Sequence, residues 1–122
     1  MATYSKVALS GGAADGTGIE LAIDSGTFTT IHTTTTTVTT LDEIWLYASN
    51  TDTDDRKLTL KFGGTDDPDD LIEYTVTAES GLALVVPGLF LAGKASTGLI
   101  LLGAAAVASK VTVFGYVNRI TA

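Results

Sequence analysis

The chain has 122 residues, 45% of them apolar, and a formal charge of −7 at neutral pH. This length and apolar content predict one folded domain with its own core and exclude a disordered segment. The negative charge disfavours nucleic acid and anionic membranes as partners, because both attract basic surfaces. Cysteine is absent, which excludes disulfides and thiolate metal ligands.

The first 26 residues predict an N-terminal arm or strand region. A short strand or arm over residues 4–9 precedes a glycine- and alanine-rich loop over residues 11–18. The glycine spacing of this loop fits neither a dinucleotide-binding loop nor a Walker phosphate loop. Alternating apolar residues over 19–24 indicate a half-buried strand. We therefore divide this single domain into an arm region, residues 1–26, and a β-sandwich region, residues 27–122.

Threonine occupies ten of the 14 positions from residue 27 to residue 40. Threonine is β-branched and favours extended chain, and the proline typical of O-glycosylated stalks is absent here. We expect an extended strand or sheet edge, which invites pairing with a neighbouring chain. The residues predicted to contact a neighbouring chain are Thr33, Thr34, Thr35, Thr36 and Thr37. The only histidine, His32, is expected at the surface, because no nucleophile motif accompanies it.

The stretch over residues 41–64 predicts a long strand, an acidic turn and a shorter return strand. Side chains alternate along a strand, so aliphatic residues occupy one face of the long strand and Trp45 and Tyr47 the other. Because both faces are apolar, we expect this strand to be central and covered on both sides. In the return strand, Leu58 and Leu60 face inward.

Further strands are predicted over residues 71–76, 82–86, 99–102 and 110–119. Pro87 and Gly88 bend the second of these, which continues in some form over residues 89–91. About eight short strands separated by turn residues predict an all-β fold, a single antiparallel β-sandwich that is jelly-roll-like or immunoglobulin-like. The residues expected in its core are Trp45, Leu58, Leu60, Val85, Val111 and Val113.

After Glu79 the only charged residues are Lys94, Lys110 and Arg119. We expect this apolar third to be buried by the fold or by other copies of the chain. Proline, glycines and Lys94 divide residues 82–108 into apolar pieces of about ten residues, whereas a membrane span needs roughly 20. No membrane partner is therefore expected.

Two groups of carboxylates deserve comparison with metal sites: Asp52, Asp54 and Asp55, and Asp66, Asp67, Asp69 and Asp70. The first group begins like a calcium loop, but Lys57 replaces the glycine of position six and no glutamate occupies position twelve. The strand between the groups separates them by roughly 20 Å, too far for one ion or for a catalytic pair. We expect solvated turns, with weak calcium binding as the alternative, and predict no cofactor.

The aromatic residues either fill the core or line a sugar-binding face. They are Trp45, Tyr47, Tyr74, Phe114 and Tyr116. They lie on different predicted strands, several of them beside aliphatic residues, so core filling is expected.

Four stretches resemble virion proteins of tailed bacteriophages: LDEIWLYASNTDTDD, DDPDDLIE, SGLALVVPGLFL and VFGYVNRI. Residues 41–120 are similar to small β-sandwich proteins called decoration or cement proteins. The resemblance implies a non-enzymatic protein on the outer surface of the phage head. Its implied partners are the major capsid protein and copies of itself, in a dimer or trimer. The alternative is a carbohydrate- or receptor-binding module of a head or tail appendage.

Overall fold

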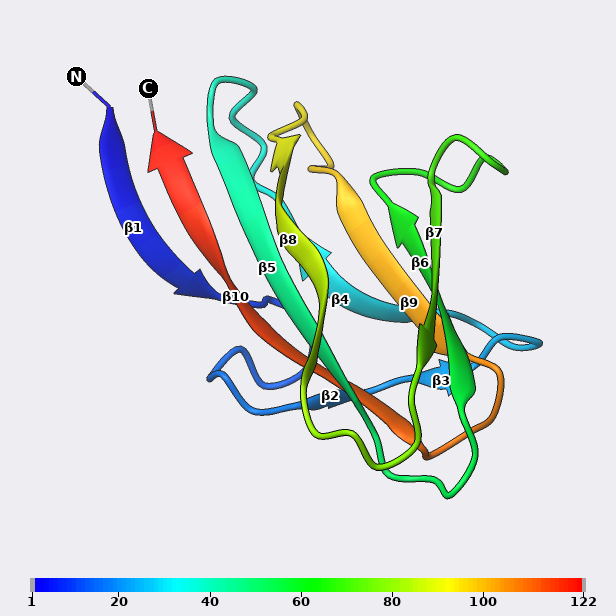
Figure 1. The fold of residues 1–122 in the computed structure, drawn as a ribbon. Coiled ribbons are helices and arrows are strands. Elements are labelled where there is room, and N and C mark those ends of the chain that lie inside the picture. Colours follow the sequence, from blue (N-terminus) through cyan, green and yellow to red (C-terminus); the bar gives the residue numbers. More distant parts are fainter. Residues whose placement is uncertain (1, 122) are drawn as a thin grey trace.

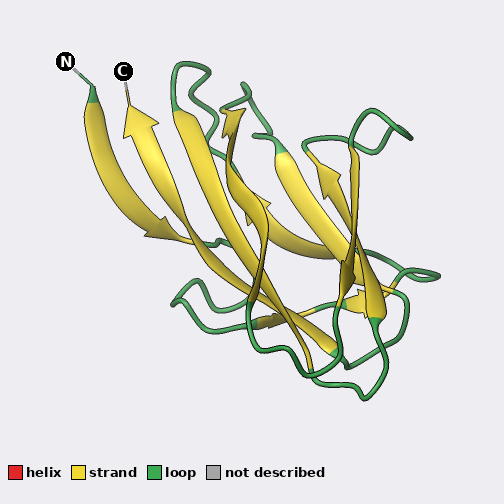
Figure 2. Cartoon of the chain, in the orientation of Figure 1, coloured by secondary structure: helices red, strands yellow, loops and turns green. Residues whose placement is uncertain are grey.

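The computed structural model describes residues 2–121, which form ten strands and no helix (Figures 1 and 2). The strands are β1 (Thr3–Ala8), β2 (Ile19–Glu20), β3 (Ala22–Ile23), β4 (Thr29–Thr33), β5 (Leu41–Asn50), β6 (Arg56–Phe62), β7 (Leu71–Val76), β8 (Ala83–Ala92), β9 (Ile100–Ala105) and β10 (Val111–Thr121). The predicted all-β sandwich is confirmed. The count exceeds eight because two of the strands, β2 and β3, are only two residues long.

The strands form two sheets. Sheet A has the order β1-β10-β5-β8, with β2 also on β10, and sheet B has the order β3-β9-β6-β7, with β4 also on β9. Every pair is antiparallel except β3 with β9. When β1 and β2 are counted as one strand, and β3 and β4 as another, eight strands remain. Numbered along the chain from 1 to 8, these strands have the order 1-8-3-6 in sheet A and 2-7-4-5 in sheet B. These are the orders of a jelly roll.

The predicted return strand does not pair with the long strand. β5 pairs with β10 and β8, whereas β6 pairs with β7 and β9 in the other sheet. The acidic turn thus carries the chain from one sheet to the other. Buried Asn50 anchors this crossing, because its Nδ2 donates to the carbonyl oxygens of Asp54 and Val76 at 2.9 and 3.0 Å. β5 is nevertheless central in its sheet.

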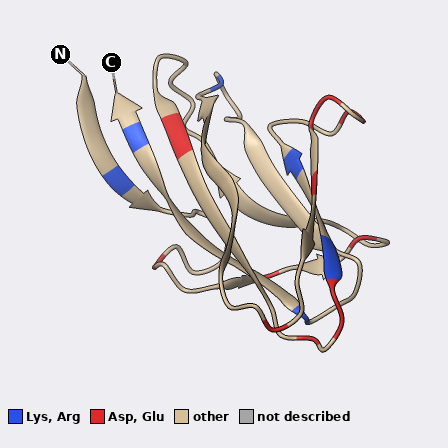
Figure 3. Cartoon of the chain, in the orientation of Figure 1, with Lys and Arg blue, Asp and Glu red and all other residues tan. Residues whose placement is uncertain are grey.

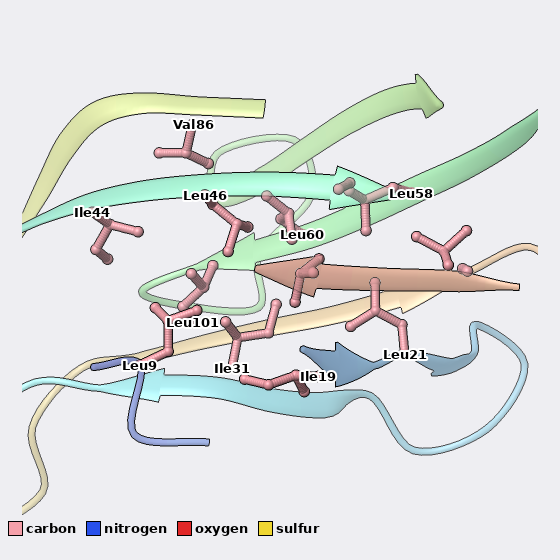
Figure 4. Packing of buried hydrophobic residues seen from close by; sticks show 14 of the residues in the cluster. Leu9, Ile19, Leu21, Ile31, Ile44, Leu46, Leu58, Leu60, Val86 and Leu101 are labelled. Carbon is pink, nitrogen blue, oxygen red and sulfur yellow. The ribbon is translucent and has the colours of Figure 1, made fainter. Parts of the chain in front are cut away.

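The core lies between the two sheets and consists of aliphatic side chains (Figure 4). Leu58, Leu60, Val111 and Val113 are fully buried, as predicted. The prediction for Trp45 is wrong, because Ile44 and Leu46 point inward and alternation turns Trp45 to the outer face. Val85 is half-buried, and it lies beside a register shift in β8.

The arm region is part of both sheets. β1 pairs with β10 over six residues, from Thr3 opposite Thr121 to Ala8 opposite Tyr116. The chain then crosses at Leu21, which is 1% exposed, because β2 pairs with β10 in sheet A and β3 with β9 in sheet B. This crossing covers one open side of the sandwich with an apolar side chain.

The threonine-rich tract is only partly extended. Its strand, β4, ends at Thr33, and residues 34–40 form a loop, so the expected strand does not continue. Hydrogen bonds turn this loop onto the segment between β8 and β9: Thr34 N donates to Leu99 O, and Lys94 N donates to Thr35 O. Threonine therefore serves here as a loop residue whose backbone and hydroxyl groups hydrogen-bond within the chain.

Candidate functional site

The five threonines predicted to make contacts differ in exposure. Thr36 and Thr37 are exposed, Thr33 and Thr35 are half-buried, and Thr34 is buried. The Thr34 hydroxyl is fully engaged, because it accepts from Leu99 N at 2.8 Å and donates to Ala92 O at 3.2 Å. The loop tip is thus the part of the tract that is free to meet another molecule. Val38 extends it with a side chain that is 60% exposed.

His32 is buried, which overturns its expected surface position. It lies in β4 with 0% exposure, and its Nε2 is 2.8 Å from Asp42 Oδ2. Arg119 completes the group from β10, with Nε and a terminal nitrogen donating to the two Asp42 oxygens at 2.8 and 2.9 Å. Burial raises the pKa of the Asp42 carboxyl, but the hydrogen bonds from Arg119 and His32 outweigh it and leave that pKa below its usual value.

The His32 imidazole has no free nitrogen for a proton transfer. Ser10 N donates to Nδ1 at 3.1 Å, so the ring hydrogen resides on Nε2 and points to Asp42. A catalytic Ser-His-Asp group needs a hydroxyl at the nitrogen that Ser10 N occupies here. The Ser10 hydroxyl instead accepts from Thr33 N at 2.8 Å. The group therefore fixes the segment after β1 to β4, β5 and β10.

The two acidic turns use several of their carboxylates to shape the chain. Asp52 pairs with Arg56 at 2.6 Å, and Asp55 accepts from Ala78 N at 2.9 Å. Asp70 accepts from Asp66 N at 3.0 Å. Within residues 2–121 no three histidine, cysteine or acidic side chains form a group that could hold a metal ion.

β8 is an edge strand with an apolar surface. It pairs only with β5, and its segment carries no charged residue from Ser80 to Gly93 (Figure 3). The exposed fractions of its large side chains are 43% for Leu84, 50% for Leu89 and 58% for Phe90. Edge strands are commonly protected by charged side chains, by proline or by bulges. Pro87 and two register shifts interrupt the backbone of this edge, but no charged side chain covers its apolar surface. Exposed apolar patches mark contacts with other proteins, with membranes or with ligands.

The outer face of sheet A carries four aromatic side chains, so the prediction that they fill the core is wrong for these four. Trp45 lies opposite Tyr116, and Tyr47 lies opposite Phe114, across the β5–β10 pair. The Trp45 and Tyr116 rings are 6.5 Å apart and inclined by 16°. Tyr74, the fifth aromatic, is 37% exposed on β7 of sheet B, so it does not fill the core either. Alternation carries this signal, because Ile44 and Leu46 beside Trp45 and Val117 beside Tyr116 all face inward.

Polar side chains continue this outer face beyond the aromatic pair. Glu43 Oε1 accepts from Trp45 Nε1 at 2.7 Å and from Asn118 Nδ2 at 3.1 Å. These two hydrogen bonds hold the pKa of the Glu43 carboxyl below its usual value. The Lys6 ammonium lies 4.5 Å from the centre of the Tyr116 ring, within range of a cation–π contact. Lys6, Glu43 and Asn118 are among the residues that line a hollow of about 360 Å³.

Comparisons with known proteins add no relative: no family model, no curated protein and no solved structure matches the chain. A search of residues 2–121 for a helix long and apolar enough to cross a membrane also finds none. The candidate surfaces are therefore the apolar edge of β8, the tip of the threonine loop and the outer face of sheet A.

Proposed function

We propose that this chain is a structural protein of a tailed-bacteriophage particle, which binds the outside of the head and stabilises the shell by bridging capsid subunits. The proposal rests first on the resemblance of residues 41–120 to decoration proteins. The jelly-roll strand order supports it by analogy, since viral capsid domains often have this fold. The observation that carries it is the uncharged, apolar edge of β8.

The partner that fits this edge is a second copy of the chain. Each copy carries a net charge of −7, so two copies repel each other unless they meet where no acid lies. The β8 segment is such a place, because no charged residue occurs between Ser80 and Gly93. Two identical edges related by a two-fold axis would form a self-complementary contact, which favours a dimer.

The contact between copies runs through side chains rather than through one continuous sheet. Pro87 has no N–H to donate, and β8 shifts register twice against β5, between Ile44 and Trp45 and between Leu46 and Tyr47. Leu84, Leu89 and Phe90 project at this interrupted edge. Burying them against a second copy removes apolar surface from water, which favours association.

The capsid contact is assigned to the exposed tip of the threonine loop, Thr36 and Thr37, with Val38 beside them. Hydrogen bonds at Thr34 and Thr35 anchor the base of this loop, so the tip is presented on a fixed scaffold. A bound protein stabilises a shell only if it binds the assembled shell better than free subunits. A rigid sandwich with two separate contact surfaces, one for a copy and one for the capsid, meets this requirement.

Sedimentation equilibrium of the purified chain tests the self-association. We expect a dimer, and we expect Leu89→Glu to weaken it by roughly 100-fold, because like charges then meet in an apolar contact. Val38→Glu, at an exposed apolar position away from β8, is the matched control and should leave the dimer unchanged. A wild-type chain that stays monomeric at all concentrations would refute the role of β8.

Heating of particles tests the decoration role. Particles that lack the chain should rupture at a lower temperature than complete particles, and added wild-type chain should restore the difference. Added Thr36→Asp/Thr37→Asp chain should restore less, because repulsion and desolvation weaken a contact at the loop tip. An unchanged rupture temperature, with the chain located on the tail, would rule out the decoration of the head.

A further inference from the structure

Side chains that lie opposite one another on neighbouring strands form rows, or rungs, across the outer face of sheet A. One of these rungs is polar. Lys6 of β1 lies opposite Asn118 of β10, which lies opposite Glu43 of β5. Both neighbouring rungs are apolar or aromatic: one holds Tyr4 and Ile120, and the other holds Tyr116 and Trp45. Hydrogen-bonding groups are thus gathered between aromatic surfaces, at the end of the sheet near both chain termini (Figure 1).

The hollow at this place has a composition unlike that of a protein contact. It measures about 360 Å³, and its lining residues are Tyr4, Ser5, Lys6, Glu43, Asn118 and Ile120. Its size lies in the range of roughly 300–1,000 Å³ that is typical of small-molecule sites. Centres of protein interfaces are depleted in lysine and glutamate, whereas this hollow has one of each. A small polar ligand fits it better than an apolar protein surface.

The polar groups are oriented and have hydrogen-bonding capacity left. Trp45 Nε1 and Asn118 Nδ2 both donate to Glu43 Oε1, which fixes the plane of the carboxylate. Within residues 2–121, no protein group donates to Glu43 Oε2 or to Asn118 Oδ1. Lys6 adds an ammonium whose position is set by the Tyr116 ring. The hollow therefore offers two acceptors and one donor around a fixed centre.

From these features we infer that the hollow binds a neutral hexopyranose unit of a glycan. A pyranose has hydroxyl groups around its rim, which suit Glu43 Oε2, Asn118 Oδ1 and the Lys6 ammonium, and an apolar C–H face. Tyr4 is 72% exposed and provides a ring on which such a face can stack. One lysine and one glutamate leave the site without net charge, which favours a neutral sugar over an acidic or a basic ligand.

This site is separate from the proposed contact between copies. The residues that line the hollow come from β1, β10 and β5 and none from β8, although Phe90 of β8 lies opposite Glu43. A variant at Leu89 rather than at Phe90 therefore separates self-association from sugar binding. The dimer variant Leu89→Glu is expected to bind sugar as the wild type does, because Leu89 lies opposite Ile44, a residue that faces the core.

Titration with methyl glycosides of glucose, galactose, mannose and N-acetylglucosamine, and with their short oligomers, tests the inference. Trp45 is the only tryptophan of the chain, so its fluorescence reports directly on the residue beside the hollow. We expect saturable binding of at least one of these sugars, and calorimetry provides a second readout that does not depend on the indole. Tyr4→Ala and Glu43→Gln should each weaken the binding by about tenfold or more, which is roughly 1.4 kcal/mol.

Tyr74→Ala is the matched control, because it removes an exposed tyrosine from the other sheet. It should leave the affinity unchanged, and thermal melting should show that all variants remain folded. The inference is overturned if none of the sugars gives a saturable response in either assay. It is equally overturned if Tyr74→Ala weakens binding as much as Tyr4→Ala does, because the sugar would then bind tyrosines without regard to the hollow.

Discussion

Acidification should destabilise the chain through His32. Burial lowers the pKa of His32 below 6.5 more strongly than the hydrogen bond and charge of Asp42 raise it, while the Arg119 charge lowers it further. Protonation of Nδ1 would also bring its new N–H against Ser10 N–H, so that two donors face each other. The His32 imidazole therefore binds a proton less readily in the folded chain than in the unfolded chain.

The sign and the size of the effect follow from this difference in proton binding. A folded-state pKa below the unfolded value contributes stability that is present above pH 6.5 and is lost as the pH falls below it. For one proton the free energy of unfolding falls by at most about 1.4 kcal/mol per pH unit. Asp42 adds its own loss only at lower pH, because its pKa lies below 3.8 in the folded chain.

Urea denaturation followed by Trp45 fluorescence measures this slope between about pH 7.5 and pH 5.5. His32 is the only side chain whose ordinary pKa lies in this range, and the His32→Gln variant separates its slope from that of the α-amino group. His32→Gln should be less stable than the wild type at pH 7.5 and should lose most of the slope. A wild-type stability that is constant across this range, or a slope that persists in His32→Gln, would refute the reasoning.

Two predictions concern the packing of the sandwich. Leu60→Ala should lower the free energy of unfolding by about 2–5 kcal/mol, because Leu60 is fully buried. Lys57→Ala, at an exposed position of the same strand, should lower it by less than about 1 kcal/mol. Equal losses for the two variants in urea denaturation would mean that the inward and outward faces of β6 are assigned wrongly. Gly115→Ala should cost roughly 1–3 kcal/mol, because a methyl group there collides with the Trp45 carbonyl oxygen, whereas Gly26→Ala meets only ordinary contacts and should be close to neutral in the same assay.

The sequence predicts the two faces of individual strands well, because alternation is a local property of extended chain. The inward set Ile44, Leu46 and Ala48 in β5, and the valines of β10, are placed correctly for this reason. What alternation does not contain is the sheet to which a strand belongs. β6 follows β5 after a short turn, and only the pairing of distant β9 with β6 draws it into sheet B.

The buried histidine was missed for a related reason. A lone histidine among threonines looks like a surface residue, and its burial depends on Asp42 and on Arg119, which lies 77 positions beyond Asp42. The position of Thr34 likewise depends on Leu99, 65 positions away. Such contacts exist only once both sheets have formed, so no pattern within one strand predicts them.

The outer aromatics show how a correct local prediction can lead to a wrong interpretation. Alternation placed Trp45 and Tyr47 opposite the aliphatic face of β5, and Phe114 and Tyr116 opposite the valines of β10. The two strands then turned out to be neighbours, which joins both pairs into one surface. Aliphatic side chains already fill the space between the sheets, so these rings are not needed there. The half-buried rings are therefore available for a ligand on the outer face, while the edge strand β8, which pairs with β5, remains available for a second copy.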